Sequence, residues 1–297
     1  MPDLFPGFAT HDVQTSGARI HARVGGSGPP LLLLHGYPQT HAIWHRVARR
    51  LAERFTVVVA DLRGYGDSEK PASAADHAPY AKRAMAQDQV EVMAALGFAA
   101  FHLVGHDRGG RVAHRLALDH PARVTTLTVL DIAPTRHMYE RGGFEFARAY
   151  YHWYFLVQPE PLPERLIGAD PEFFLREKLG RGRVGLAPFA PGALAEYVRC
   201  FTAPAAIHAS CEDYRAAAGL DLEHDRTDEA ARIEAPLLAL WGAHGVVHRC
   251  FDVLAAWRER ARSVAGRPLA CGHYIAEEAP DALMAELLPH LERGTEP

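Results

Sequence analysis

The chain has few cysteines and no long apolar run. Its 297 residues include only four cysteines, which lie far apart and form neither C-x-x-C pairs nor the spacing of a metal site: Cys200, Cys211, Cys250 and Cys271. Because disulfide frameworks form in oxidising compartments, we expect free thiols and a cytoplasmic location. No stretch reaches the roughly 18 apolar residues of a membrane span, so we expect no membrane insertion.

The sequence also lacks a large excess of charge of one sign. Its 32 basic and 36 acidic residues give a formal net charge of −4. Such a balance offers no basic surface for nucleic acid or anionic lipid, and an anionic ligand would need locally placed arginines. The N-terminus, MPDLFPGFATHDVQ, carries acidic residues and no basic segment before an apolar run, which argues against an export signal.

The composition and the apolar pattern predict an α/β fold. Hydrophobic residues make up 48% of the chain, and 297 residues suit one catalytic domain with an insertion. Short apolar runs separated by helical patterns are typical of strands buried on both faces of a mostly parallel sheet. The predicted strands are Ile20–Val24, Leu31–Leu34, Val57–Ala60, Phe101–Val104, Leu127–Leu130 and Pro236–Trp241, and Tyr80–Leu96 is a predicted crossover helix that ends before Gly97.

The regular alternation of strands and helices stops after Pro134. An aromatic, proline-rich segment of about a hundred residues follows before Ala235-Pro236 begins another strand. We therefore predict a first part of the catalytic core over residues 1–134, an inserted helical cap over 135–233, and a second part of the core over 234–297.

The predicted strand Phe101–Val104 leads into GHDRGGR and then a helix over Val112–Leu118. This small-x-nucleophile-x-small pattern is typical of a strained turn that lifts one side chain above the sheet edge, and here that residue is Asp107. A carboxylate at this place makes covalent esters by alkylation, which predicts substitution at an sp³ carbon. The plainer alternative is an aspartate that caps a turn or a helix.

Other residues of such a site occur in the expected chain order. The strand Leu31–Leu34 runs into HGYPQT, where the N–H of Tyr37, together with that of Arg108, would form an oxyanion hole. His273 follows the last predicted strand and is the candidate base. The loop after Trp241 carries no carboxylate, so we assign Asp131, at the end of an earlier strand, to orient the imidazole.

Taken together, the segments HGYPQT, HDRGGR, Tyr151-His152-Trp153, CEDYR and Gly272-His273 resemble the haloacetate (fluoroacetate) dehalogenases of the α/β-hydrolase superfamily along nearly the whole chain. Related haloalkane dehalogenases and epoxide hydrolases usually carry tryptophan after the nucleophile, where this chain has Arg108. Arg108 and Arg111, three residues apart on one helix, could grip a substrate carboxylate together. The alternative is that Arg111 only pairs with a neighbouring acid.

The resemblance implies further roles. His152, Trp153 and Tyr214 match the cap residues that hydrogen-bond the departing halide. Asp107 would displace halide from a small 2-haloacid, and water activated by His273 would hydrolyse the resulting ester. The resemblance implies no metal or organic cofactor, and it suggests a homodimer.

Two departures leave alternatives open. The segment Lys178–Gly185 lacks a tryptophan of the family and is basic and glycine-rich, which could favour chloro-, bromo- or bulkier 2-haloacids over fluoroacetate. Tyr154 with Tyr214 could instead supply the tyrosine pair of an epoxide hydrolase, although Arg108 argues against an uncharged epoxide. A remoter alternative is a ligand receptor that has lost turnover.

Overall fold

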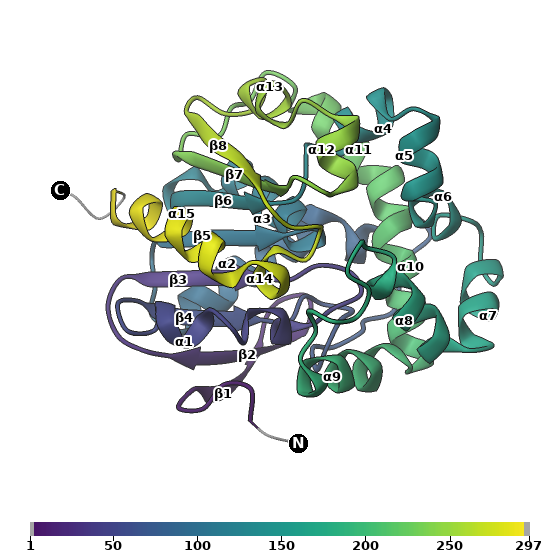
Figure 1. Ribbon diagram of the computed structural model, residues 1–297, viewed down its shortest axis with the longest axis horizontal. Coiled ribbons are helices and arrows are strands. Elements are labelled where there is room, and N and C mark those ends of the chain that lie inside the picture. The colour runs from purple at the N-terminus through teal and green to yellow at the C-terminus, as the bar shows by residue number, and fades with distance from the viewer. Residues whose placement is uncertain (1–2, 294–297) are drawn as a thin grey trace.

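The computed structural model describes residues 3–293 and shows an eight-stranded sheet between helices (Figure 1). The strand order is β1-β2-β4-β3-β5-β6-β7-β8; β1 and β2 run antiparallel to their neighbours, and the other pairs are parallel. The strands are β1 (Ala9–Gln14), β2 (Arg19–Gly25), β3 (Pro30–Leu34), β4 (Thr56–Ala60), β5 (Phe101–His106), β6 (Val124–Leu130), β7 (Leu237–Gly242) and β8 (Val264–Leu269).

Both faces of the sheet are buried, as the apolar runs predict. Along β3, Leu31 and Leu33 belong to one hydrophobic cluster, whereas Leu32 and Leu34 belong to another. Because successive side chains of a strand point to opposite faces, the two clusters lie on opposite sides of the sheet. This confirms the expected α/β-hydrolase type of architecture, a mostly parallel sheet covered by helices.

All six predicted strands form, as β2 to β7, but the outermost strands were not predicted. Strand β1 is largely exposed, and β8 (VAGRPL) contains glycine, arginine and proline and buries only its last residue. Neither strand therefore contains a continuous apolar run. The predicted crossover helix is α2 (Lys82–Ala95), and α3 (Arg108–Asp119) begins directly after Asp107, four residues before the start that we predicted.

A group of helices separates β6 from β7 in the chain, and Figure 1 shows it at one end of the sheet. The group consists of α4 (Thr135–Arg141), α5 (Phe144–Ala149), α6 (His152–Phe155), α7 (Leu162–Gly168), α8 (Pro171–Gly180), α9 (Pro191–Phe201), α10 (Pro204–Ala218) and α11 (Leu220–Thr227). Contacts between this group and residues that follow β5 and β8 show that it covers the carboxyl ends of the parallel strands. Ligands of open α/β sheets bind at that edge.

The remaining helices flank the sheet. They are η1 (His41–Trp44), α1 (Ala48–Leu51), η2 (Ala78–Tyr80), η3 (Pro121–Arg123), α12 (Val246–Cys250), α13 (Val253–Arg258), α14 (Ile275–Glu278) and α15 (Pro280–Arg293).

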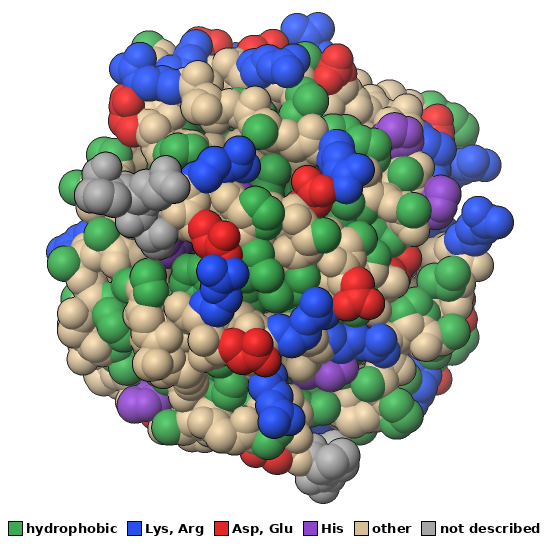
Figure 2. All heavy atoms as spheres, turned by 60° about the vertical axis from the view of Figure 1, so that its left-hand side comes forward, with side chains coloured by type: hydrophobic (Ala, Val, Ile, Leu, Met, Phe, Trp, Pro, Cys, Tyr) green, Lys and Arg blue, Asp and Glu red, His purple; other side chains and the backbone are tan. Residues whose placement is uncertain are grey.

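On the face seen in Figure 2, basic and acidic side chains are interspersed. Among the described helices, none combines the length and the apolar character that crossing a bilayer requires.

Candidate active site

Asp107 lies on a strained turn between β5 and α3. Its φ of 47° is in the left-handed region, which a side chain other than glycine rarely adopts. The turn is tight enough to require its glycines: a Cβ on Gly105 would lie 2.5 Å from the carbonyl oxygen of Gly109, and a Cβ on Gly109 would lie 2.3 Å from that of His35. The predicted elbow therefore exists, and it holds the Asp107 carboxylate above the strand end.

The carboxylate of Asp107 has a neighbour at each of its two oxygens. The N–H of Tyr37 donates to Oδ1 at 2.9 Å, and Nε2 of His273 lies 3.9 Å from Oδ2. Burial alone would raise the pKa of Asp107, but the charges of His273 and of Arg111 and Arg108 outweigh it and lower that pKa to about 2. The group is therefore an ionised, nearly buried carboxylate, as a nucleophile must be.

His273 is oriented by Asp131. Its Nδ1 donates to Oδ2 of Asp131 at 2.5 Å, which directs Nε2 toward Asp107. The other oxygen of Asp131 accepts from the N–H of Gly242 at 2.9 Å, so the end of β7 contributes a backbone donor where it lacks a carboxylate. The three residues assigned from the sequence as nucleophile, orienting acid and base thus lie together, with His273 hydrogen-bonded to Asp131 and 3.9 Å from Asp107.

Arg108 has a partner that the sequence analysis did not foresee. Its Nε and Nη2 donate to the two carboxylate oxygens of Asp213 in α10, at 2.8 and 2.7 Å, and both side chains are fully buried. Asp213 also accepts from Tyr65 Oη at 2.6 Å and forms an ion pair with Lys82. The remaining guanidinium nitrogen, Nη1 of Arg108, is buried with no hydrogen-bond partner among the described residues.

Arg111 does not pair with an acid of the described chain, contrary to the alternative considered from the sequence. Its Nη1 donates to the carbonyl oxygen of Ala133 at 3.2 Å and to Oγ1 of Thr135 at 3.0 Å, while its buried Nε has no partner among residues 3–293. The opposite charge of Asp107 acts on Arg111 at longer range than an ion pair, and a buried cation without a direct partner is costly. Two neighbouring arginines, each with a free buried N–H, form a site suited to a small carboxylate.

The cap residues suggested by the resemblance converge beside these arginines. The guanidinium of Arg108 lies over the ring of Tyr214 at 4.1 Å, and that of Arg111 lies over the ring of Trp153 at 4.6 Å. The rings of His152 and Tyr214 are 5.7 Å apart. Three polar atoms of this set, His152 Nδ1, Trp153 Nε1 and Tyr214 Oη, are buried without a hydrogen-bond partner among the described residues.

Tyr154 lies elsewhere. It is 38% exposed, and its ring packs on Tyr139 and Phe146, which themselves contact the ring of Trp153. A partly exposed tyrosine in an outer layer is poorly placed to share an oxygen with the buried Tyr214. Tyr150 does reach the catalytic residues, because its Oη lies 3.3 Å from Nδ1 of His273.

Tyr150 and Asp213 were missed by the sequence analysis. Tyr150 is one of several aromatic residues of the inserted segment, and nothing in its spacing separates it from its neighbours. Asp213 stands within the CEDYR segment beside Tyr214. A carboxylate adjacent to a predicted site residue was therefore the available signal.

A cavity of about 630 Å³ opens beside the catalytic residues. Its lining includes Tyr150, His152 and His273, together with the cations Lys178 and Arg181. Asp107, which is only 4% exposed, does not line it. We call the buried surroundings of Asp107 the chamber, and we call the cavity, whose lining includes His152 and His273, the vestibule.

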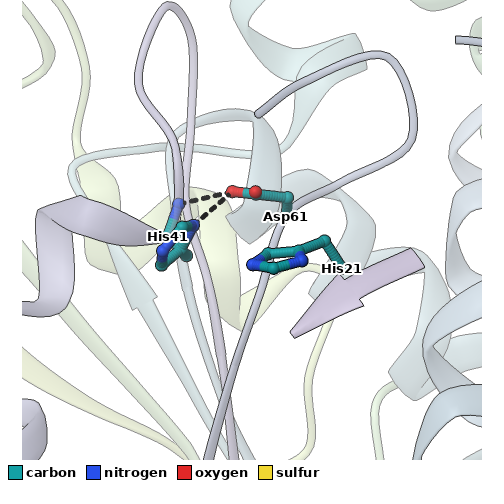
Figure 3. Close-up of side chains that lie close together, drawn as sticks. All are labelled: His21, His41 and Asp61. Atoms are coloured by element: carbon teal, nitrogen blue, oxygen red, sulfur yellow. Dashed lines mark hydrogen bonds and ion pairs between the residues drawn. The ribbon is translucent and has the colours of Figure 1, made fainter. Parts of the chain in front are cut away.

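A second polar cluster lies under the loop that carries Tyr37. Nitrogens of His21 and His41 and a carboxylate oxygen of Asp61 lie within 4.8 Å of one another, which is close enough for a metal ion (Figure 3). Both carboxylate oxygens of Asp61 already accept hydrogen bonds, however. The donors are the backbone N–H and Nδ1 of His41, at 2.7 and 3.0 Å, and the N–H of Asp67 at 2.9 Å.

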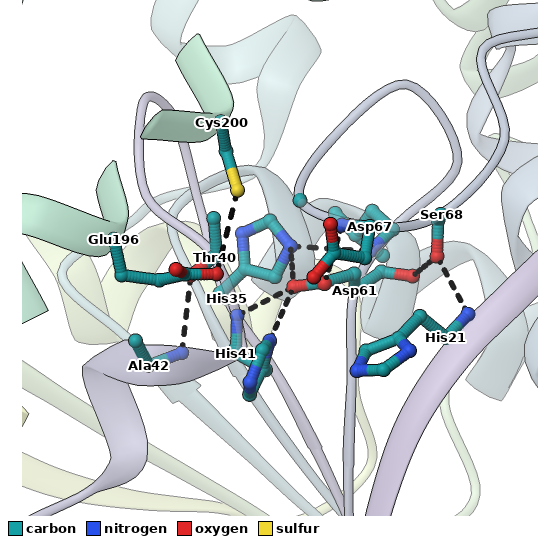
Figure 4. A network of polar contacts seen from close by, with 12 residues as sticks. His21, His35, Thr40, His41, Ala42, Asp61, Asp67, Ser68, Glu196 and Cys200 are labelled. Carbon is teal, nitrogen blue, oxygen red and sulfur yellow. Dashed lines mark hydrogen bonds and ion pairs between the residues drawn. The ribbon is translucent and has the colours of Figure 1, made fainter. Parts of the chain in front are cut away.

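The cluster holds two loops together. His35, which begins the loop after β3, accepts from the N–H of Leu62 at 3.1 Å, and its Nε2 is 3.7 Å from Asp61 (Figure 4). Burial alone would raise the pKa of Asp61, but His41 outweighs it and holds that pKa well below its usual range. We interpret the cluster as a structural support that fixes the backbone of Tyr37.

Comparisons with known proteins agree with this geometry. The sequence pattern of the α/β hydrolase fold family matches residues 29–280. The chain is 50% identical to fluoroacetate dehalogenase from Burkholderia sp, over 94% of this chain and 92% of that protein, and 36% identical to soluble epoxide hydrolase from Corynebacterium sp. (strain C12), over 91% and 92%. A solved structure from Nostoc sp PCC 7120, described as an α/β hydrolase, superposes with a TM-score of 0.91 at 59% identity and covers 94% of this chain and 96% of its own.

Both the matched pattern and the identity to these relatives extend over most of the chain, the inserted helices included. The chain therefore belongs to the α/β-hydrolase fold family, in the branch that contains fluoroacetate dehalogenase.

Proposed function

We propose that the protein is a haloacetate dehalogenase that converts small 2-haloacids to 2-hydroxy acids and halide. The observation that carries the proposal is the set of buried N–H and O–H groups without partners around one carboxylate nucleophile. Because buried polar groups are nearly always hydrogen-bonded, so many unpaired donors point to an anionic ligand. Arg108 and Arg111 suit its carboxylate, and Trp153, Tyr214 and His152 suit the halide that forms.

In the first step, an oxygen of Asp107 attacks the α-carbon and displaces the halide with inversion. The C–O bond forms as the carbon–halogen bond breaks, and the halide leaves with both bonding electrons. Fluoride is a poor leaving group, so donors placed around the departing atom lower the barrier by stabilising its growing negative charge. Burial lowers the pKa of His152 well below its usual range, which leaves a neutral ring that can donate one N–H.

In the second step, water hydrolyses the ester. A water molecule bound beside Nε2 of His273, which lies 3.9 Å from Oδ2 of Asp107, gives a proton to His273 and attacks Cγ of Asp107. The N–H groups of Tyr37 and Arg108 stabilise the oxyanion. As the intermediate collapses, the alkoxide takes the proton from His273, and Asp107 finally loses the proton of its new carboxyl group to solvent.

The decisive experiment uses the variant His273→Asn. It should form the ester with chloroacetate and release one equivalent of chloride per active site, but should not turn over, and mass spectrometry should locate the adduct on Asp107. A ligand receptor would accumulate no adduct. In parallel, the wild-type protein is assayed for halide release from fluoro-, chloro- and bromoacetate and for diol formation from styrene oxide. Diol without halide would identify an epoxide hydrolase instead.

We further propose three properties that rest on the resemblance and on composition. Residues 135–233 would act as a cap domain that closes the chamber, because Trp153 and Tyr214 come from this segment. The chain would form a homodimer, which sedimentation at micromolar concentration tests. Its location would be cytoplasmic, in keeping with four free cysteines.

A further inference from the structure

The lining of the vestibule is strongly basic. Five arginine and lysine side chains line the 630 Å³ cavity, namely Arg148, Lys178, Arg181, Arg183 and Arg249, against one carboxylate among the described residues, Glu278. Such a concentration of one sign contrasts with the interspersed charges of the face in Figure 2. It is also unexpected in a chain whose net charge is −4.

Four of these five cations form no ion pair within the described chain. The carboxylate of Glu278 accepts from the N–H groups of Gly272 and Tyr274, at 2.6 and 2.9 Å, and forms no ion pair there. Arg249 is held by Glu145 at 2.9 Å. In contrast, Lys178 and Arg181 form no ion pair with any residue among 3–293, and each lies over an aromatic ring.

Those aromatic faces connect the cations to the catalytic residues. The ammonium of Lys178 lies 5.8 Å from the ring centre of Tyr150, whose hydroxyl is 3.3 Å from Nδ1 of His273. The guanidinium of Arg181 lies 4.8 Å from the ring centre of Tyr151. One tyrosine side chain therefore separates Lys178 from the base, His273. Lys178 is also close enough to Asp107 for the charge of that carboxylate to affect the pKa of Lys178.

In the proposed reaction, a substituent on the attacked carbon can point in this direction. The halogen would face Trp153 and Tyr214, the carboxylate would face the two arginines, and Asp107 would approach opposite the halogen. Two substituent positions remain on a tetrahedral carbon. In haloacetate both are hydrogen, and a larger group in place of one of them would extend past His152 and His273, which line the vestibule.

We propose that Lys178 and Arg181 form a second anion-binding subsite, and that the preferred substrates are 2-halo dicarboxylates, whose second carboxylate reaches from the chamber into the vestibule. This inference rests on the proposed dehalogenase function and specifies its substrate class. The reaction is unchanged: Asp107 displaces halide from the carbon that bears the first carboxylate, and hydrolysis yields a 2-hydroxy dicarboxylate. Because only one of the two free positions can face the vestibule, one enantiomer should react.

The test compares two substrates of equal length, 2-chlorosuccinate and 2-chlorobutanoate, by chloride release at low ionic strength. We expect the wild-type kcat/KM to be about tenfold or more higher for one enantiomer of the diacid, because a charge-assisted contact gives about that factor. The double variant Lys178→Met, Arg181→Gln should lower the ratio of the two kcat/KM values by the same factor. The control Arg176→Gln, on the same helix but paired with Glu172, should leave the ratio unchanged.

The outcomes separate this inference from the proposed function. If the wild type releases chloride from chloroacetate and shows no preference for the diacid, the second subsite is refuted and the dehalogenase function stands. If the double variant loses activity equally toward both substrates, the cations attract any anion and the subsite is again refuted. If neither chloroacetate nor the diacid yields chloride, the proposed function itself fails.

Discussion

Replacing Asp213 by asparagine tests how the cap and the nucleophile elbow depend on each other. Asp213 in α10 accepts hydrogen bonds from Arg108, at 2.8 and 2.7 Å, and from Tyr65 Oη at 2.6 Å. It also forms an ion pair with Lys82, and all four side chains are buried. Asparagine has nearly the same shape but no charge. The variant therefore leaves two buried cations with one counter-ion fewer and introduces an N–H that faces other donors.

The expected loss of stability follows from this arrangement. Removing one partner of a buried ion pair usually costs about 3–5 kcal/mol. Because Asp221 remains 3.6 Å from Lys82 and still neutralises part of its charge, we expect the lower end, about 3 kcal/mol. As a control, Asp12→Asn removes a charge paired with Arg19 at 2.9 Å on the surface, which should cost below about 1 kcal/mol.

Urea unfolding at pH 7, followed by circular dichroism, measures both variants. Burial would raise the pKa of Asp213, but Arg108 and Lys82 outweigh it and hold that pKa well below its usual range. A depressed native pKa contributes stability that is present above the unfolded pKa of about 3.9 and is lost as the pH falls. The difference between wild type and Asp213→Asn should therefore shrink in acid. A loss no larger than that of the control would refute the reasoning.

Four further changes have defined expectations. Trp153→Phe removes one of the groups that donate a hydrogen bond to the halide. The kcat for halide release should therefore fall on the order of 100-fold with fluoroacetate and by less with bromoacetate. Equal losses with the two substrates would argue against a halide role for Trp153. Tyr150→Phe removes the hydroxyl 3.3 Å from His273 and should slow ester hydrolysis about fivefold, seen as accumulated adduct in quench experiments. Asp61→Asn should lower the melting temperature in full between pH 5 and pH 7, and its effect should shrink only as the pH falls below about 4, the unfolded pKa, since the native pKa of Asp61 is depressed. Burial lowers the pKa of Lys178 to about 8, so Lys178 loses its charge as the pH rises through 8. The kcat/KM for 2-chlorosuccinate should therefore decline over this range, whereas the kcat/KM for 2-chlorobutanoate should not.

The sequence predicted the interior of the fold better than its edges. Strands such as β3, buried on both faces, consist of continuous apolar residues, and this pattern is visible without any structure. Strands β1 and β8 lie at the two edges of the sheet, so they need little apolar surface and produce no such pattern. Their position depends on pairing with a neighbour, which a single sequence does not reveal.

The candidate site could be located because parallel topology brings strand ends together. Asp107, Asp131 and His273 follow β5, β6 and β8, and each was recognisable by its place after a strand or by the glycines around it. The ion pair between Arg108 and Asp213 joins residues 105 positions apart and depends on how α10 lies across the elbow. No periodicity encodes that contact, so Arg108 was predicted with its role but without its partner.

That partner changes how the substrate site should be understood. A guanidinium held in fork geometry by Asp213 cannot turn freely, so its one free nitrogen, Nη1, points in a fixed direction. Arg111, which has no acid beside it in the described chain, supplies the net charge. We therefore infer that Arg108 orients the substrate carboxylate and that Arg111 attracts it. Replacing Arg111 should mainly raise KM, whereas loosening Arg108 through Asp213 should also lower kcat, because a misoriented carboxylate places the α-carbon out of line with Asp107.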